Sequence, residues 1–172
     1  MTVQEDPEQN PERPWGPEDP KEDPDDPNKP ENPDDPTPPA AAATFVEKDA
    51  TNFKLGQDNQ VRGIGNVIVA ITCPKAIENL VVTIESENDE FIGIISTFGL
   101  TKPFDLANPG DLEEGLKGLG LKTGAEVKGL TYTEFDITGF MPLLTYDGKH
   151  TFTIAVTDTE GATSSEKIVL VY

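Results

Sequence analysis

Prolines at every third or fourth position dominate residues 5–39 of this chain, and they argue against a compact fold there. Twelve of the sixteen prolines lie before Ala40, and most residues between them are acids or amides. Each proline pushes the residue before it to extended angles. A spacing of three matches the turn of a polyproline II helix, and like charges stiffen the chain further. We therefore predict a semi-rigid spacer with a reach of roughly 100 Å.

The charge and the apolar content divide the chain into two parts. Residues 1–39 hold thirteen acidic and three basic residues, which is −10 of the chain's −19, so the remaining residues carry −9. The first part has too few apolar side chains to offset the entropy of ordering. The second part is long enough for one domain with its own core. We predict a disordered acidic proline-rich linker over 1–43 and one domain over 44–172.

The acidic balance excludes several classes of partner. Nucleic acid binding requires clustered Lys and Arg, and anionic lipid surfaces also attract basic segments. No apolar run approaches the length of a membrane span. The start, MTVQEDPEQ, lacks the apolar stretch of a signal peptide. The protein is then either cytosolic or the mature part of an exported protein, and we favour the second.

Alternating apolar residues predict β-strands in the second part of the chain. In the stretch NVIVAITC, for example, Val67, Val69, Ile71 and Cys73 share one face. The DTEG stretch has turn residues and should join the last two strands into an antiparallel hairpin. The predicted strands cover residues 66–73, 79–85, 132–137, 150–158 and 166–172.

In the middle of the domain the apolar residues recur with the spacing of an α-helix. Residues 86–99 place Phe91, Ile95 and Phe98 on one stripe, with Ser86 as a cap and Gly99 at the end. Residues 108–120 begin with Asn108 as a cap and Pro109 in the first helical position. Residues 138–144 should form one more helical turn capped by Thr138.

The order of these elements predicts a mainly β fold. An antiparallel sheet with one apolar face must pack against a second layer. We predict an immunoglobulin-like β-sandwich with one or two short helices inserted mid-domain. The alternative is an α+β sheet with the helices covering one face. Four aromatic rings fall on apolar faces and should be core: Phe91, Phe98, Phe135 and Phe152.

The sequence offers little catalytic chemistry. Cys73 lies on a strand's apolar face and should be a small buried hydrophobe. His150, the only histidine, lies at a strand edge and should be structural or solvent-facing. Asp158 and Glu160 share a loop but lack the ligand spacing of a calcium loop. We therefore expect no enzyme, no catalytic residues, no cofactor and no metal site.

Exposed aromatic rings are the usual platform for sugars, because an apolar ring face matches a pyranose. The domain has no Trp, and most of its Phe residues fall on predicted core faces. Tyr132 and Tyr146 are the two candidates for glycan contact.

The C-terminal stretch, residues 136–172, carries a family resemblance. Its segment HTFTIAVTDTEGAT resembles the last two strands of bacterial extracellular Ig-like modules. The whole chain looks similar to cell-surface lipoproteins of gut Bacteroidetes, which have a lipidated Cys, a Pro/Asp/Glu-rich stretch and Ig-like domains. The resemblance implies an extracytoplasmic location on the outer membrane, with contact to the membrane only through a lipid anchor outside this chain.

Two functions remain open at this point. The first is a non-catalytic interaction or structural module, held off the membrane by the acidic stalk, that meets a protein or glycan at the cell surface as a monomer. The alternative is a carbohydrate-binding accessory domain of a glycan-capture system. An enzyme ranks third.

Overall fold

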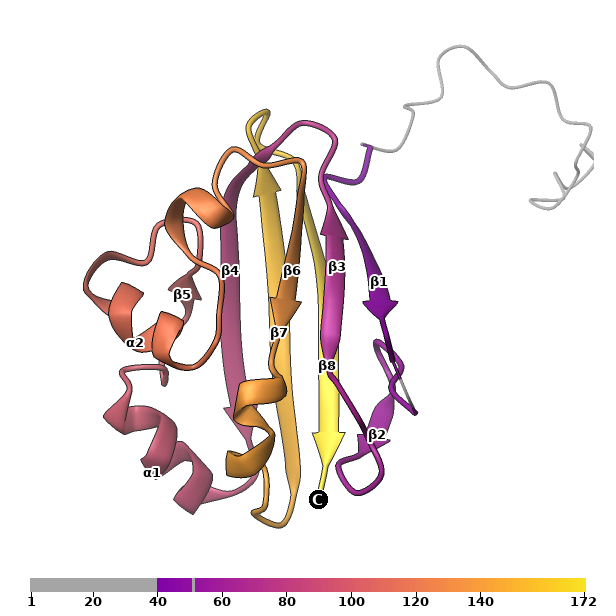
Figure 1. Cartoon of the computed structure of the whole chain (residues 1–172), viewed down its shortest axis with the longest axis vertical. Coiled ribbons are helices and arrows are strands. Elements are labelled where there is room, and N and C mark those ends of the chain that lie inside the picture. Colours follow the sequence, from indigo (N-terminus) through magenta and orange to yellow (C-terminus); the bar gives the residue numbers. More distant parts are fainter. Residues whose placement is uncertain (1–39, 51) are drawn as a thin grey trace, which may run out of the picture. The chain divides into compact units, whose positions relative to one another are not determined.

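Two β-sheets packed face to face form the body of the protein. The structure is a computed structural model that describes residues 40–50 and 52–172, so the predicted spacer at 1–39 lies outside the described residues. The smaller sheet has the strand order β1-β3-β6 and the larger one β2-β8-β7-β4-β5. In Figure 1 the smaller sheet lies in front of the larger one. The mainly β prediction is confirmed.

The strands have the following bounds. The smaller sheet consists of β1 (Thr44–Lys48), β3 (Ile68–Thr72) and β6 (Tyr132–Asp136). The larger sheet consists of β2 (Asp58–Gln60), β8 (Thr163–Val171), β7 (Lys149–Asp158), β4 (Ile77–Ser86) and β5 (Phe104–Asp105). All pairs are antiparallel except β2 with β8, which is parallel. The short strands β1, β2 and β5 are absent from the predicted set.

The core lies between the two sheets and is built from the predicted alternation. Val69 and Ile71 of β3 are fully buried, as are Ile154 and Val156 of β7. Each alternates with a side chain on the outer face of its sheet, because successive residues of a strand point to opposite sides. Cys73 is also buried, and burial raises the pKa of its thiol, so the prediction of a small buried hydrophobe is confirmed.

The predicted hairpin is confirmed. β7 and β8 pair from Thr157 with Thr163 to Lys149 with Val171, so β8 begins three residues earlier than predicted. Asp158 is buried in the turn, where its Oδ1 accepts hydrogen bonds from the backbone N–H groups of Glu160 and Ala162, both at 2.9 Å. The carboxylate thus closes the turn.

The first predicted helix is shorter than expected and has a different cap. Helix α1 spans Asp89–Thr97, and Asn88 rather than Ser86 caps it: Asn88 Oδ1 accepts from the N–H groups of Glu90 and Phe91. Ser86 is unavailable because β4 continues to this residue, which pairs with His150. Gly99, at φ +74°, follows the helix as predicted.

The second predicted helix is reduced to a few turns. A 3₁₀ turn, η1, covers Gly110–Leu112, and helix α2 covers Glu113–Gly118. The Asn108 cap was wrong, because this side chain donates instead to Asp105 Oδ2 at 2.7 Å. A further 3₁₀ turn, η2, covers Gly124–Glu126.

The third helical segment, η3 (Thr138–Leu143), confirms the predicted turn at 138–144. Thr138 does not cap it, since its Oγ1 accepts from the N–H of Val67, the residue before β3, at 3.3 Å. Phe140 of η3 meets Phe152 of β7 edge-on, with ring centroids 5.6 Å apart. η3 therefore extends the core beyond the smaller sheet.

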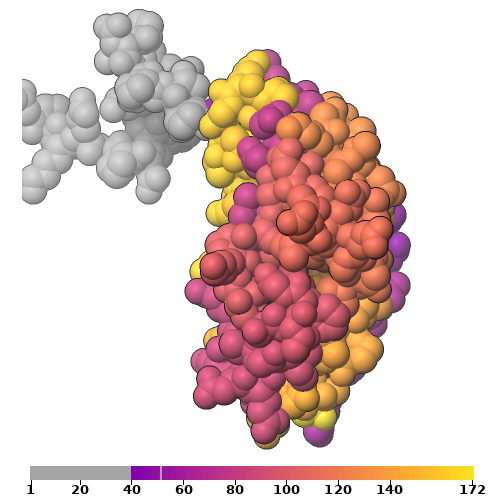
Figure 2. Space-filling view, turned by 90° about the vertical axis from the view of Figure 1, so that its left-hand side faces the viewer, coloured from indigo at the N-terminus to yellow at the C-terminus, as the bar shows by residue number. Residues whose placement is uncertain are grey.

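The helical segments cover one side of the domain. Figure 1 shows α1 and α2 beside β4 and β5, and Figure 2 shows their surface from that side. The second layer over the larger sheet is therefore the smaller sheet, flanked by helices.

Two residue predictions need correction. Phe98 is 40% exposed, because α1 ends at Thr97 and the chain reverses at Gly99, so that Leu100 takes the buried position instead. Ala42 and Ala43 are buried, and Ala43 N–H donates to Ser164 Oγ at 3.2 Å. The folded part therefore begins at least two residues before the predicted boundary at 44.

Candidate functional site

The two candidate tyrosines lie on different parts of the domain. Tyr132 begins β6 and is 47% exposed on the outer face of the smaller sheet. Tyr146 lies in the loop before β7 and is partly buried against the core. β6 and β7 begin at opposite ends of the domain in Figure 1. The structure therefore does not bring the two rings together, and they cannot form one platform.

Tyr132 belongs to a cluster centred on Glu134. The carboxylate Oε1 of Glu134 accepts from Lys48 Nζ at 2.5 Å and from the Tyr132 hydroxyl at 2.8 Å. Its Oε2 lies 3.5 Å from Lys122 Nζ. These residues come from β1, from the segment before β6 and from β6 itself. Both carboxylate oxygens of Glu134 are therefore engaged at the surface of the sheet.

The register of the smaller sheet places this cluster on its outer face. Val46 of β1 pairs with Ala70 of β3, which pairs with Glu134 of β6. In the next row of this face, Thr44 pairs with Thr72, which pairs with Tyr132. Directly paired residues point to the same side of a sheet. We call this outer face of β1, β3 and β6 the Tyr132 face.

The hydrogen bonds of the cluster fix its charges. The Lys48 ammonium and the Tyr132 hydroxyl, with Lys122 nearby, lower the pKa of Glu134 to about 2. The same contacts with Glu134 raise the pKa of Lys48 and that of Tyr132. At neutral pH the cluster therefore presents a carboxylate, an ammonium and a neutral phenol.

Two large exposed apolar side chains lie on the Tyr132 face. In the part of the chain that the structure describes, four large apolar residues are exposed: Val46, Phe98, Leu130 and Tyr132. Val46, at 56%, and Tyr132 lie on this face, and Leu130 precedes β6 by two residues. An exposed aliphatic and an exposed aromatic side chain on one face of a sheet make that face a candidate contact surface.

His150 is fully buried and does not face a substrate site. Its Nδ1 lies 2.8 Å from Ser86 Oγ and its Nε2 lies 2.9 Å from the Tyr146 carbonyl oxygen. The Phe91 ring covers it, with ring centroids 4.6 Å apart. Of the two predicted roles, structural and solvent-facing, the structural one is confirmed.

A second polar cluster joins β4, β5 and the segment between β5 and η1. Asp105 Oδ2 accepts from the amides of Asn79 and Asn108, and Oδ1 accepts from the N–H groups of Leu80 and Ala107. Burial opposes the ionisation of Asp105, but these four donors outweigh it and lower its pKa. Because all four hydrogen bonds come from the protein, this carboxylate is a structural anchor.

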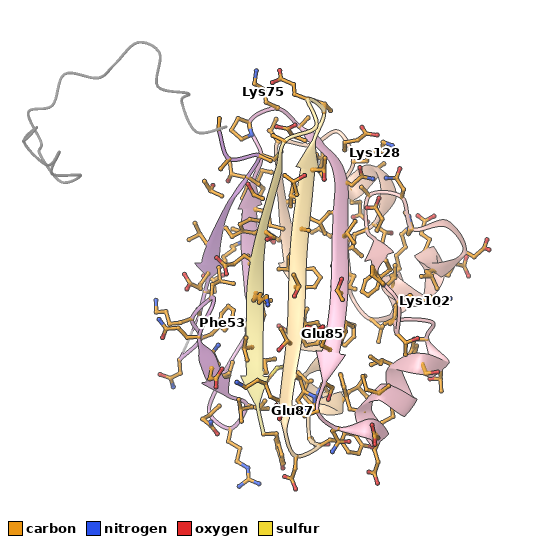
Figure 3. All side chains as sticks on the ribbon, turned by 180° about the vertical axis from the view of Figure 1, so that it is seen from behind. Phe53, Lys75, Glu85, Glu87, Lys102 and Lys128 are labelled. Atoms are coloured by element: carbon orange, nitrogen blue, oxygen red, sulfur yellow. The ribbon has the colours of Figure 1, made fainter. Side chains whose placement is uncertain are left out.

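Lys128 extends this cluster at the surface. Its Nζ lies 2.7 Å from Asn108 Oδ1 and 3.1 Å from Glu78 Oε1. Figure 3 shows Lys128 beside the start of β4, the strand that carries Glu78. The ammonium thus ties the segment after η2 to β4. Within residues 40–50 and 52–172, no three His, Cys, Asp or Glu side chains gather as a metal site would require.

The sequence prediction found Tyr132 but missed Lys48, Lys122 and Glu134. Glu134 stands two residues after Tyr132 in a predicted strand, so the alternation places both on one face. Lys48 is brought close by the strand pairing of the smaller sheet, and Lys122 comes from the loop between α2 and η2.

The chain matches no family model, curated protein or solved structure to a significant degree. No helix in the described part of the chain has the length and apolar character needed to cross a membrane.

Proposed function

We propose that this domain is a non-catalytic interaction module of a surface-anchored lipoprotein and that it meets its partner through the Tyr132 face. The observation that carries the proposal is the exposure of Val46 and Tyr132 on this one face of the sheet. Contact surfaces combine an apolar centre with aromatic rings and polar groups at the edge. Lys48, Glu134 and Lys122 supply the polar groups here.

The pKa values of the titratable groups on the Tyr132 face favour a role in binding over a role in proton transfer. A general acid or base works best with a pKa near the working pH. The pKa of Glu134 is about 2, and those of Lys48 and Tyr132 move upward, away from neutrality. Each group therefore keeps one protonation state near pH 7.

The proposed immunoglobulin-like fold is supported by the order of the strands. In that fold, strands A, B and E are neighbours in one sheet, and C, F and G are neighbours in the other. The orders β1-β3-β6 and β4-β7-β8 follow this pattern if β1, β3, β4, β6, β7 and β8 are taken as A, B, C, E, F and G. The helical segments then stand where strand D would lie.

Site-specific photo-crosslinking on intact cells tests the interaction module. A photoreactive amino acid replaces Val46 on the Tyr132 face, and in a matched variant it replaces Glu85, which is exposed on β4 of the other sheet (Figure 3). We expect one defined cross-linked species from position 46 and none from position 85. Equal cross-linking from both positions, or none from position 46, would contradict the proposal.

Carbohydrate binding is the second candidate, and Tyr132 favours it. The ring is about half exposed, and an acceptor and a donor for sugar hydroxyls lie next to it in Glu134 and Lys48. Isothermal titration calorimetry against a panel of polysaccharides tests this function. Loss of a measured affinity on Tyr132→Ala, but not on Tyr146→Phe, would support it.

A further inference from the structure

We propose that the Tyr132 face takes an uncharged oligosaccharide whose neighbouring hydroxyl groups bridge Glu134 and Lys48. This inference rests on the second proposed function, carbohydrate binding, and specifies its ligand class. It follows from three properties of the face: the pairing of donor and acceptor groups, the open surroundings of the ring, and the balance of charge.

The donor and acceptor groups match a pair of adjacent hydroxyls. Lys48 Nζ and Glu134 Oε1 lie 2.5 Å apart, so one ligand could reach both. An ammonium only donates and a carboxylate only accepts, whereas a hydroxyl does both. Glu134 Oε1 already accepts from Lys48 and Tyr132, so one sugar hydroxyl can donate to Oε2 while its neighbour accepts from another N–H of Lys48. A charge-assisted hydrogen bond is stronger than a neutral one, which favours this arrangement.

The surroundings of the Tyr132 ring leave room for a flat ligand. The residues paired across from it, Thr72 and then Thr44, are small and exposed. The adjacent row places Ala70 and Val46 beside Glu134. Three neighbouring strands span about 10 Å. A sugar stacked on Tyr132 could thus lie across the small side chains of β3 without meeting a bulky neighbour.

The charges on the face favour an uncharged ligand over an acidic one. Lys48 and Lys122 are opposed by Glu134 and by Asp136, which lies on the same side of β6 two residues further on. The two cations and two anions leave no excess of positive charge. Residues 40–172 as a whole carry −9, and a net negative protein repels polyanions. Uronate or sulfate groups would therefore bind here less well than hydroxyls.

Calorimetry or affinity electrophoresis with two sets of polysaccharides tests the inference. One set is uncharged (β-glucan, mannan, xylan) and the other is acidic (polygalacturonate, heparin). We expect binding to at least one uncharged polymer and to neither acidic one. Tyr132→Ala should weaken that binding by at least about tenfold, and Glu134→Gln by a similar factor. Tyr146→Phe is the matched control and should bind like the wild type.

The outcomes separate this inference from the functions on which it rests. Binding to the acidic set alone, lost in Tyr132→Ala, would overturn the uncharged ligand but leave carbohydrate binding standing. No binding to either set would overturn both, while a protein cross-linked at position 46 would still support the interaction module. Binding to an uncharged polymer that survives Tyr132→Ala would overturn the placement on this face.

Discussion

Ser86 Oγ lies 2.8 Å from His150 Nδ1, and this contact joins the end of β4 to the start of β7. The Tyr146 carbonyl can only accept, so Nε2 carries the proton of the neutral His150 ring and Nδ1 of that tautomer accepts from the Ser86 hydroxyl. Ser86 Oγ in turn accepts from the N–H of Asn88, the cap of α1, at 2.9 Å. The single histidine therefore orders a helix, a strand and a loop at once.

Replacing Ser86 by Ala should destabilise the domain by about 1–3 kcal/mol, because it leaves a buried ring nitrogen without a partner. Urea denaturation measures the change. Ser165→Ala on the exposed side of β8 is the control and should change the stability by less than about 0.5 kcal/mol. Equal effects of the two changes would argue against a structural role for the Ser86–His150 pair.

Asp105→Asn should destabilise the domain by about 1–3 kcal/mol at pH 7, because an amide cannot accept from all four donors around Asp105. The pKa of Asp105 is lower in the folded state. The carboxylate's contribution is therefore fully present above the unfolded value of about 4, and it is lost as the pH falls through the folded value.

The difference in unfolding free energy between wild type and Asp105→Asn should accordingly shrink below about pH 4. Denaturation curves at neutral and acidic pH measure it. Asp111→Asn, at an exposed position in η1, is the control. A difference that stays constant with pH would show that the charge of Asp105 contributes nothing.

Two glycine-to-alanine substitutions should change the stability of the domain in opposite directions. A Cβ at Gly139 would lie 2.4 Å from the Leu119 carbonyl oxygen, so η3 and the end of α2 would have to separate. We expect a loss of about 1–3 kcal/mol. A Cβ at Gly93 in α1 meets nothing within 4 Å, and alanine there should stabilise by up to about 1 kcal/mol. Thermal unfolding measures the melting temperature of both variants. A shift of the same sign in both would contradict the close contact between Gly139 and Leu119.

Glu134→Gln should lower the pKa of Tyr132 toward the ordinary value for tyrosine of about 10. The Glu134 carboxylate raises that pKa, because it accepts a hydrogen bond from the phenol and repels the phenolate. Titration of Tyr132 by NMR reports the change. Glu126→Gln, at an exposed position outside the cluster, should leave Tyr132 unaffected. No shift in Glu134→Gln would mean that the hydrogen bond does not form in solution.

Alternation along the chain was a reliable guide to the long strands, but local signals misplaced the helix caps. Ser86 fits a capping pattern by spacing alone, yet it pairs with His150 because β4 runs two residues past its last buried position, Ile84. Asn88 therefore caps helix α1 in place of Ser86. Such a shift depends on partners distant in the sequence, which a local pattern does not contain.

The Tyr132 face could be predicted only in part, for a similar reason. Tyr132 and Glu134 share one strand, so their common side follows from period two. Lys48 is 86 residues away from Glu134 in the sequence. The two side chains meet because β3 pairs with both β1 and β6 and so places these strands in one sheet. Nothing in the local composition of β1 specifies that neighbour.

The parallel pairing of β2 with β8 has a consequence for how the domain assembles. β8 lies between β2 and β7, although Asn59 and Val169, joined by a side-chain hydrogen bond, are 110 residues apart. The larger sheet therefore stays incomplete until β8 has left the ribosome. Long-range pairing of this kind slows folding. A nascent chain lacking β8 would expose the unpaired edges of β2 and β7. Such edges can pair with other chains, so prematurely terminated chains should be prone to aggregation.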